Sequence, residues 1–524
     1  MRKLSTLFCA VLMTLSAMAT DYKGNLTVSI NGEGSTQPAT ISIVENAGKY
    51  NLSILNFMLG EGESVLPVGN IVIENVTGAV AGNLTTLYVN KNITIQKGNV
   101  AGIADDAWLG PMLGEVPVKM SSSFNTNGFL GVNIDIDMVS TLGQVIKVTF
   151  ENVGNHFQMP NSDFETWSNE NNAPKHWHGF ESVKGKLSGT AKSKTKLVSS
   201  KNVRPGSKGL TSAVVTSTKV FTVIANGTMT NGVLNAGSMS AADASNHSET
   251  DLSSTSKDAN GDPFATPMYA KPDSVKFWMR FTQAKAQASY PNAAFNAVIT
   301  DGTYYQDPEN KTYTNKVAVA APNKADMTVG DWRLVSCPFD YASYAANGAE
   351  AKAILLTVST NATPGKGSYS NGVADSVYVD DLELVYLADI KSVSFKGATL
   401  DLTNTDIDIA DDDVISANDF VVEKIGEDAK VTTLVEANAK GYQAVISVVS
   451  GDLNTQKTLV FNFNKPVWAD GDVNHDGVVD LADVTLLINK VLGADATQLY
   501  NPDVNADGNV DVADVTTLVS LILG

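Results

Sequence analysis

The strongest constraint on this chain is a duplicated segment near its C-terminus, where Asp472–Asp483 recurs 31 residues later as Asp503–Asp514. Both copies carry oxygen-bearing side chains at positions 1, 3, 5, 9 and 12, glycine at position 6 and a backbone carbonyl donor at position 7. Four carboxylates in so short a loop repel one another unless a divalent cation lies among them. The pattern therefore predicts two bound calcium ions. The predicted ligands are Asp472, Asn474, Asp476, Val478, Asp480 and Asp483 in the first loop, and Asp503, Asn505, Asp507, Asn509, Asp511 and Asp514 in the second.

Each loop leads into a segment in which apolar residues recur every three or four positions, which predicts one amphipathic helix after each loop. Position 12 is Asp in both loops, where paired-helix calcium sensors usually have Glu. With this departure, residues 468–524 resemble the type I dockerin family. The predicted buried stripes are Leu481, Val484, Ile488 and Val491 in the first helix, and Val512, Val515, Leu518 and Ile522 in the second.

The resemblance to dockerins implies an attachment module that docks on a cohesin-type domain of another protein. In that family, the residues at loop positions 10 and 11 contact the partner. Here both copies have an apolar pair at these positions, Leu481-Ala482 and Val512-Ala513, where many relatives have Ser-Thr. The departure leaves the identity of the cohesin open.

The first 19 residues are typical of a secretory signal. Met1-Arg2-Lys3 supplies two cations, an apolar stretch follows, and Ala17-Met18-Ala19 is a small-x-small cleavage site. The alternative, a membrane anchor, requires about 20 apolar residues, and neither this stretch nor any later segment is that long. Because no small residue precedes Cys9, we expect an exported protein, secreted or held at the cell surface, that is neither a lipoprotein nor membrane-spanning.

The composition favours strands joined by tight turns. The chain has 41 Gly among 524 residues, and only 18% of its residues are charged. The net charge of −19 argues against nucleic acid as a partner, because such a surface repels phosphates. After cleavage Cys337 is the one cysteine left, which excludes an internal disulfide and a thiolate zinc site.

Residues 20–157 divide into eight segments in which apolar and polar residues alternate, as in Leu26–Ile30 and Val132–Met138. Eight antiparallel strands with short links can close into an up-and-down β-barrel, which leaves no free edge. The order and lengths of these segments resemble the calycin-like domains of secreted proteins. A barrel of this size either holds one small apolar ligand or is filled by its own side chains.

Residues 158–388 open with Asn161–Trp167 and Pro174–Trp177 and close with Val377–Leu384. These "NxDFExW", "PxxW" and "VYVDDLEL" segments resemble the ends of the carbohydrate metabolism domain family, whose jelly-roll β-sandwich is similar to carbohydrate-binding modules. In similar sandwiches, a glutamate of the opening segment and an aspartate of the closing one share a structural calcium. Glu165 and Asp381 match those positions.

The segment Val275–Phe281 has one apolar face, predicted to lie in the core, and one face that carries Lys276, Trp278 and Arg280. An indole ring between two cations can bind a sugar, because the ring packs on C–H groups while the cations donate hydrogen bonds to hydroxyls. The alternative is that the tryptophans of this module belong to its core. We expect that for Trp167 and Trp332, while both interpretations stay open for Trp278.

Residues 389–466 alternate again and carry an acidic patch over Asp401–Asp413. Their length and pattern predict a small immunoglobulin-like β spacer, and the patch is interpreted as a solvated loop. The predicted chain is thus mainly β: a barrel, a jelly-roll sandwich, a β spacer and a C-terminal α-helical dockerin.

These features favour an exported, non-catalytic protein that binds glycan through residues 158–388 and attaches through its dockerin, and no catalytic residue is predicted. One alternative is an O-glycosyl hydrolase with its active site in the same sandwich, because dockerins are most often carried by such enzymes. It requires a deep cleft with two facing carboxylates. A second alternative, a carrier of a small apolar ligand, requires an unfilled barrel interior.

Overall fold

The computed structural model describes residues 19–60, 65–152, 157–168, 173–194, 197–494 and 499–524. Of the predicted signal at residues 1–19, only Ala19 lies within these ranges. Contacts divide the chain into two compact units, one of residues 1–392, 422–432 and 446–458, the other of residues 393–421, 433–445 and 459–524. Within the described ranges, no helix combines the length and apolar character needed to cross a membrane.

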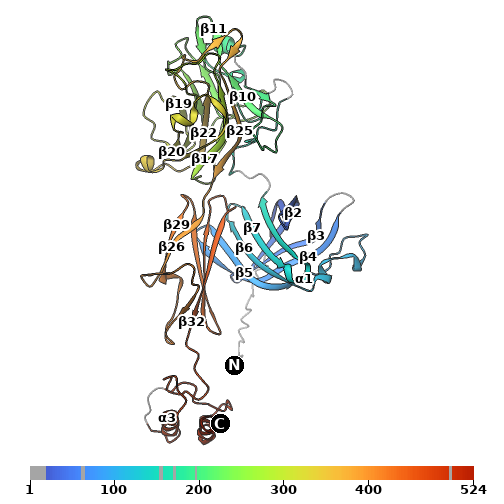
Figure 1. Cartoon of the computed structure of the whole chain (residues 1–524), viewed down its shortest axis with the longest axis vertical. Coiled ribbons are helices and arrows are strands. Elements are labelled where there is room, and N and C mark those ends of the chain that lie inside the picture. Colours follow the sequence, from blue (N-terminus) through green and yellow to red (C-terminus); the bar gives the residue numbers. More distant parts are fainter. Residues whose placement is uncertain (1–18, 61–64, 153–156, 169–172, 195–196, 495–498) are drawn as a thin grey trace, which may run out of the picture. The chain divides into compact units, whose positions relative to one another are not determined.

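The N-terminal region is a closed barrel of eight antiparallel strands in sequential order, with β1 pairing β8 to close it, as predicted (Figure 1). A short helix, α1 (Val139–Leu142), joins the last two strands. The strands are β1 (Ala19–Ile30), β2 (Glu33–Asn46), β3 (Lys49–Leu59), β4 (Leu66–Ala81), β5 (Leu84–Thr94), β6 (Glu115–Asn125), β7 (Leu130–Met138) and β8 (Gln144–Asn152).

Side chains of the barrel strands fill its interior. Alternate residues of each strand point inward, and Leu26, Leu52, Ile73 and Met120 are at most 1% exposed. A cavity of about 40 Å³ lies among the apolar side chains of the interior, lined by Leu26, Ile73 and their neighbours. Because an apolar ligand needs far more room, the structure does not support the ligand-carrier alternative.

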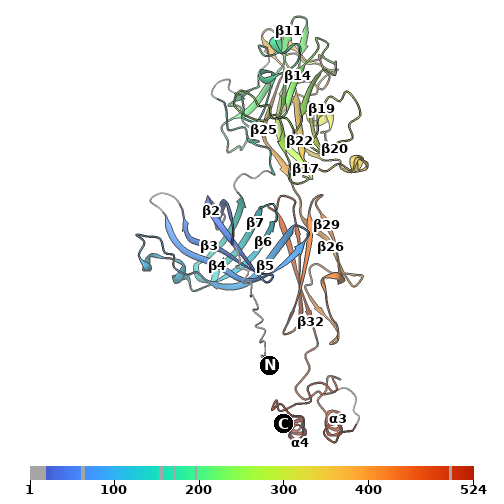
Figure 2. The ribbon, with the colours of Figure 1, turned by 180° about the vertical axis from the view of Figure 1, so that it is seen from behind.

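The middle region is a β-sandwich with two principal sheets, in the orders β21-β17-β25-β10-β9 and β13-β22-β18-β20, with β16 also pairing β22. A third sheet, β14-β15-β19, and the hairpins β11–β12 and β23–β24 complete it (Figure 2). A short helix, α2 (Ser188–Ala191), precedes the strands. The strands are β9 (Leu197–Ser200), β10 (Ser212–Thr216), β11 (Thr218–Val220), β12 (Val223–Ala225), β13 (Thr228–Thr230), β14 (Val233–Ala236), β15 (Asn246–Thr250), β16 (Thr266–Pro267), β17 (Ser274–Thr282), β18 (Ala294–Thr300), β19 (Tyr305–Asp307), β20 (Lys316–Ala320), β21 (Gly330–Pro338), β22 (Ala353–Ser359), β23 (Tyr369–Ser370), β24 (Val373–Ala374) and β25 (Ser376–Val385).

The core of the sandwich lies between its two principal sheets. The apolar face predicted for β17 is confirmed, since Val275, Phe277, Met279 and Phe281 are all fully buried. Phe277 stacks on Phe295 of β18 with ring centroids 4.1 Å apart. Cys337 of β21 is buried in the same core, and burial raises the pKa of its thiol to about 12.

The spacer region forms two sheets, in the orders β27-β26-β29 and β28-β32-β31-β30. Phe395, Phe420 and Phe463 contact one another, with ring centroids 4.7–5.7 Å apart. The C-terminal region contains the helices α3 (Leu481–Val491) and α4 (Val512–Leu523), which pack against each other (Figure 2). The strands are β26 (Asp389–Phe395), β27 (Ala398–Thr399), β28 (Asp406–Asp408), β29 (Phe420–Ile425), β30 (Lys430–Asn438), β31 (Gly441–Val449) and β32 (Gln456–Asn464).

Two leucines of β3 allow a matched test of the barrel interior. Leu52 is fully buried, whereas Leu55 is 60% exposed. We expect Leu52→Ala to lower the free energy of unfolding by about 2–5 kcal/mol, because it leaves a void in a packed interior. Leu55→Ala should change it by less than about 0.5 kcal/mol. Calorimetry of the full chain would measure both, and equal shifts would contradict the packed interior.

Candidate functional sites

The predicted sugar platform on β17 lies on the outer face of its sheet, but its groups have partners within the chain. Lys276 Nζ lies 2.8 Å from Glu383, and Arg280 Nε lies 3.2 Å from Asp331. The Arg204 guanidinium lies over the Trp278 ring, 5.3 Å from its centroid. A sugar bound here would have to displace these contacts.

Trp332 lies on this outer face too, and the prediction that it belongs to the core is wrong. In strand β21, Val335 and Cys337 point into the core. The side chains that alternate with them, including those of Leu334 and Trp332, lie on the outer face. The Trp332 ring makes an edge contact with Tyr378, and its indole N–H donates to Asn202. Trp167, by contrast, packs against the core as expected.

The predicted calcium ligands of the sandwich also have other partners. One oxygen of Glu165 accepts hydrogen bonds from the backbone N–H groups of Leu210 and Thr211, at 2.9 and 2.8 Å. The Asp381 carboxylate forms an ion pair with Arg204. The positive charge of Arg204 at this position disfavours a bound cation. A calcium ion shared by Glu165 and Asp381 therefore stays a prediction that these contacts do not support.

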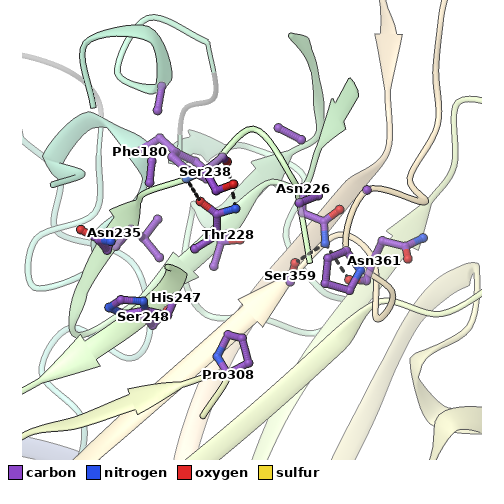
Figure 3. Close-up of a pocket in the computed structure, with 18 of the residues that line it drawn as sticks. Phe180, Asn226, Thr228, Asn235, Ser238, His247, Ser248, Pro308, Ser359 and Asn361 are labelled. Carbon is purple, nitrogen blue, oxygen red and sulfur yellow. Dashed lines mark hydrogen bonds between the residues drawn. The ribbon is translucent and has the colours of Figure 1, made fainter. Parts of the chain in front are cut away.

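The sandwich contains a cavity of about 460 Å³ that sequence analysis missed. The cavity lies on the outer face of the β13-β22-β18-β20 sheet. The residues that form its floor alternate with core residues along the strands, so they point away from the core. On β18, Ala294 and Asn296 line the cavity while Phe295 and Ala297 face the core. The other floor residues are Thr357 of β22 and, labelled in Figure 3, Thr228 of β13 and Ser359 of β22.

The cavity walls come from distant segments of the same module. The β14-β15-β19 sheet contributes one side, and the β11–β12 hairpin contributes another. The segments 238–241 and 361–365 add to the walls, as do Phe180, Leu187 and the helix α2. Wall residues include Leu234, Asn235, Ala236, Asn246, His247, Ser248, Asp307 and Pro308 from the sheet, and Val220, Val223 and Ala225 from the hairpin.

Several polar groups of the lining are neutral amides and hydroxyls. Asn226 donates through Nδ2 to Ser359 Oγ at 3.1 Å and to the Asn361 carbonyl at 2.8 Å (Figure 3). Three side-chain oxygens of the lining residues, Asn226 Oδ1, Ser248 Oγ and Thr357 Oγ1, are buried with no hydrogen-bond partner among the described residues. Buried polar atoms normally have a partner, so these three oxygens are unusual; each is enclosed by protein and is not exposed to the cavity.

The cavity has little charge. Asp307 is the one carboxylic acid among the described lining residues, and burial raises the pKa of its carboxyl above the ordinary value. His247 Nε2 lies 3.0 Å from Glu249 Oε2, and this hydrogen bond holds the pKa of Glu249 below its usual range. The site therefore suits a neutral polar ligand with apolar surface better than a strongly charged one.

One sequence signal could have indicated this cavity. On β18 and β22 the residues opposite the core include Asn296, Thr357 and Ser359, which are neutral, whereas the outer face of β17 carries charges. The remaining lining residues belong to separate segments that only the fold brings together.

The two duplicated loops have the same geometry. Gly477 and Gly508 have φ of +91° and +88°, which confirms the sharp turn expected at position 6. Asp472 accepts the N–H of Gly477 at 2.9 Å, and Asp503 accepts that of Gly508 at 2.8 Å. Position 9 caps each helix: Asp480 accepts from Ala482 and Asp511 accepts from Ala513, both at 2.7 Å.

The carboxylates of these loops fit a calcium ion by their chemistry and burial. Asp472, Asp483 and Asp514 are buried, and no Lys or Arg of the described chain forms an ion pair with them. No three His, Cys, Asp or Glu side chains of the described residues converge closely enough to form a metal site by themselves. The assignment therefore rests on the donor set, which includes the asparagines and the carbonyls of Val478 and Asn509.

The dockerin core differs in part from the predicted stripes. Val484, Leu487 and Leu518 are buried, with Val515 packed against them. Ile488 is outside this core, because Leu487 takes the position facing α4. Leu481 and Val512, predicted to lie in the stripe and also at the partner face, are 73% and 67% exposed, and Ala482 and Ala513 are exposed too. Leu481 and Val512 therefore do not belong to the core, and the docking role of the four residues stays a prediction.

Calcium should control the folding of residues 468–524. Buried like charges destabilise the loops without a cation, and the apolar core is small, so binding free energy contributes directly to folding. Chelation should abolish the helical circular dichroism of the isolated segment, and added Ca²⁺ should restore it, with Mg²⁺ substituting poorly.

The matched variants for this experiment are Asp472→Ala and Asp470→Ala. The first substitution removes a buried loop ligand. The second changes the net charge equally, but Asp470 is exposed and lies just before the loop. Asp472→Ala should weaken the calcium response and Asp470→Ala should not. Full helicity in chelator would show that the metal is not required.

Comparisons with known proteins identify one domain at each end of the chain. The family models for the calycin-like beta-barrel domain and the dockerin type I domain match residues 18–153 and 470–523. Type I dockerins bind calcium and dock on cohesins, and proteins that carry them are typically extracellular or attached to the cell surface. No curated protein matches the sequence.

Two solved structures align with this chain over most of their own length. A Bacteroides fragilis NCTC 9343 protein, provisionally described as an outer membrane protein, is 9% identical over 65% of this chain and 96% of its own, with a TM-score of 0.18. The N-terminal CBM22-1-CBM22-2 tandem domain from Paenibacillus barcinonensis Xyn10C is 12% identical over 70% and 93%, with a TM-score of 0.21. Scores this low carry no argument about function.

Proposed function

We propose that this chain, which carries a calycin-like β-barrel domain and a type I dockerin, is an exported, non-catalytic protein that binds a neutral glycan in its sandwich domain. The observation that carries the proposal is the cavity of about 460 Å³ on the outer face of the β13-β22-β18-β20 sheet. Its volume lies in the range of about 300–1,000 Å³ that is usual for small-molecule sites. The dockerin attaches this binding domain to a cohesin-bearing partner when calcium is present.

The lining supports a saccharide as the ligand. Sugars present hydroxyls, which pair with amides and hydroxyls, and C–H faces, which pack on apolar side chains. The cavity offers both kinds of surface, in Asn235, Ser238 and Asn246 and in Leu234 and Val223. The platform at Trp278 is the weaker candidate, because Arg204 covers the ring and the neighbouring cations form ion pairs.

A glycan array with the full chain, followed by calorimetric titration, tests the proposal. Ala294→Phe should reduce binding by about tenfold or more, because the new ring fills the cavity from its floor while the core residues beside it are unchanged. Trp278→Ala, which removes the platform, should leave binding nearly unchanged. The opposite pattern would place the glycan on the platform, and no binding to any glycan would contradict the proposed function.

The hydrolase alternative requires a pair of carboxyl groups at the site. Glycoside hydrolysis usually uses two carboxyl groups about 5–9.5 Å apart across the scissile bond. Among the described residues lining the cavity, Asp307 is the one that carries a carboxyl group. Its raised pKa would suit a general acid, but the lining supplies no second carboxylate as base or nucleophile.

We therefore expect no reducing-sugar release from a panel of polysaccharides. Asp307→Asn provides the specific control, since it preserves shape and removes the acid. Sugar release by the wild-type chain that this substitution abolishes would show that the hydrolase alternative is correct.

A further inference from the structure

The β11–β12 hairpin forms one wall of the cavity, and Phe221 lies at its tip. The strands pair up to Val220 and Val223, so that Phe221 and Thr222 form a two-residue turn. Both Val220 and Val223 line the cavity. Phe221 follows Val220 directly, which places its Cα about 3.8 Å from that of a wall residue.

Phe221 is unfavourable at this position for folding alone. Its φ is +55°, a conformation in which bulky residues are rare and which glycine or asparagine usually takes in such turns. Its side chain is 79% exposed, so the ring also lacks the stabilisation that burial would supply. Strained residues of this kind concentrate at ligand sites.

We infer that Phe221 is a ligand-contacting residue whose ring stacks on one sugar unit at the mouth of the cavity while the neighbouring unit enters it. This inference rests on the proposed function and deepens it, because it names an aromatic surface beside the cavity in addition to Phe180 of the lining. Aromatic rings attract the C–H face of a pyranose and have no requirement for charge, which agrees with the neutral lining. The site should therefore prefer neutral saccharides of at least two units to monosaccharides and to uronic acid oligomers.

Three substitutions in the full chain test the inference. Phe221→Gly should reduce affinity by about tenfold, with a melting temperature that is unchanged or raised, because glycine suits the positive φ. Phe221→Trp should retain binding, since it keeps an aromatic surface. Leu210→Ala is the matched control: Leu210 is 78% exposed in the same domain but, unlike Phe221, is not adjacent in sequence to any lining residue, so its loss should have no effect.

Calorimetric titration with cellotriose, xylotriose, mannotriose, maltotriose and chitotriose, and with trigalacturonic acid as the charged probe, gives the readout. Loss of binding in Phe221→Gly together with retention in Phe221→Trp supports the inference. If Phe221→Gly binds like the wild type while Ala294→Phe does not bind, the inference is wrong and the proposed function stands. If the wild-type chain binds none of the probes, both are wrong.

Discussion

The alternation of side chains along each strand is the constraint on which the rest of this structure depends. In a strand, neighbouring residues point to opposite faces, so burial of one set determines where the other set lies. On β17 this alternation puts Phe277 and Met279 in the core and leaves Trp278 outside. On β18 it puts Phe295 in the same core and directs Ala294 and Asn296 into the cavity. The packing of one core thus creates two outer faces with different chemistry.

These two faces differ in the kind of polar group that they present. On the β17 face, each cation lies near a carboxylate or an aromatic ring of the chain, and such contacts hold side chains in place without recruiting a ligand. The described lining of the cavity is mostly neutral, with amides such as Asn235 and Asn246 and one carboxylic acid, Asp307. A neutral ligand can bind such a lining without displacing ion pairs of the protein, as it would have to on the β17 face.

The C-terminal module depends on electrostatics more than on packing. Its apolar core consists of a few side chains, including Val484, Leu487 and Leu518, while its loops bury carboxylates. Neither would be stable alone, because a domain this small buries little surface and buried like charges repel. We expect bound calcium to offset both effects, which would make attachment of the chain to its partner dependent on the metal.

The sequence by itself determined the elements whose physics is local. The spacing of Asp472 and the other loop ligands, together with the glycines of the two loops, predicts the dockerin. The alternation of apolar and polar residues over residues 20–157 predicts the eight-stranded barrel. Each pattern depends on residues close together in the chain. The core face of β17 was predictable for the same reason. The tertiary structure alone decided which outer face could accept a ligand. Asn226, Ser248, Asp307 and Thr357 lie far apart in sequence, and only strand pairing brings them around one cavity. Likewise, Arg204 approaches Trp278 through the fold, and no periodicity in either segment could indicate that contact.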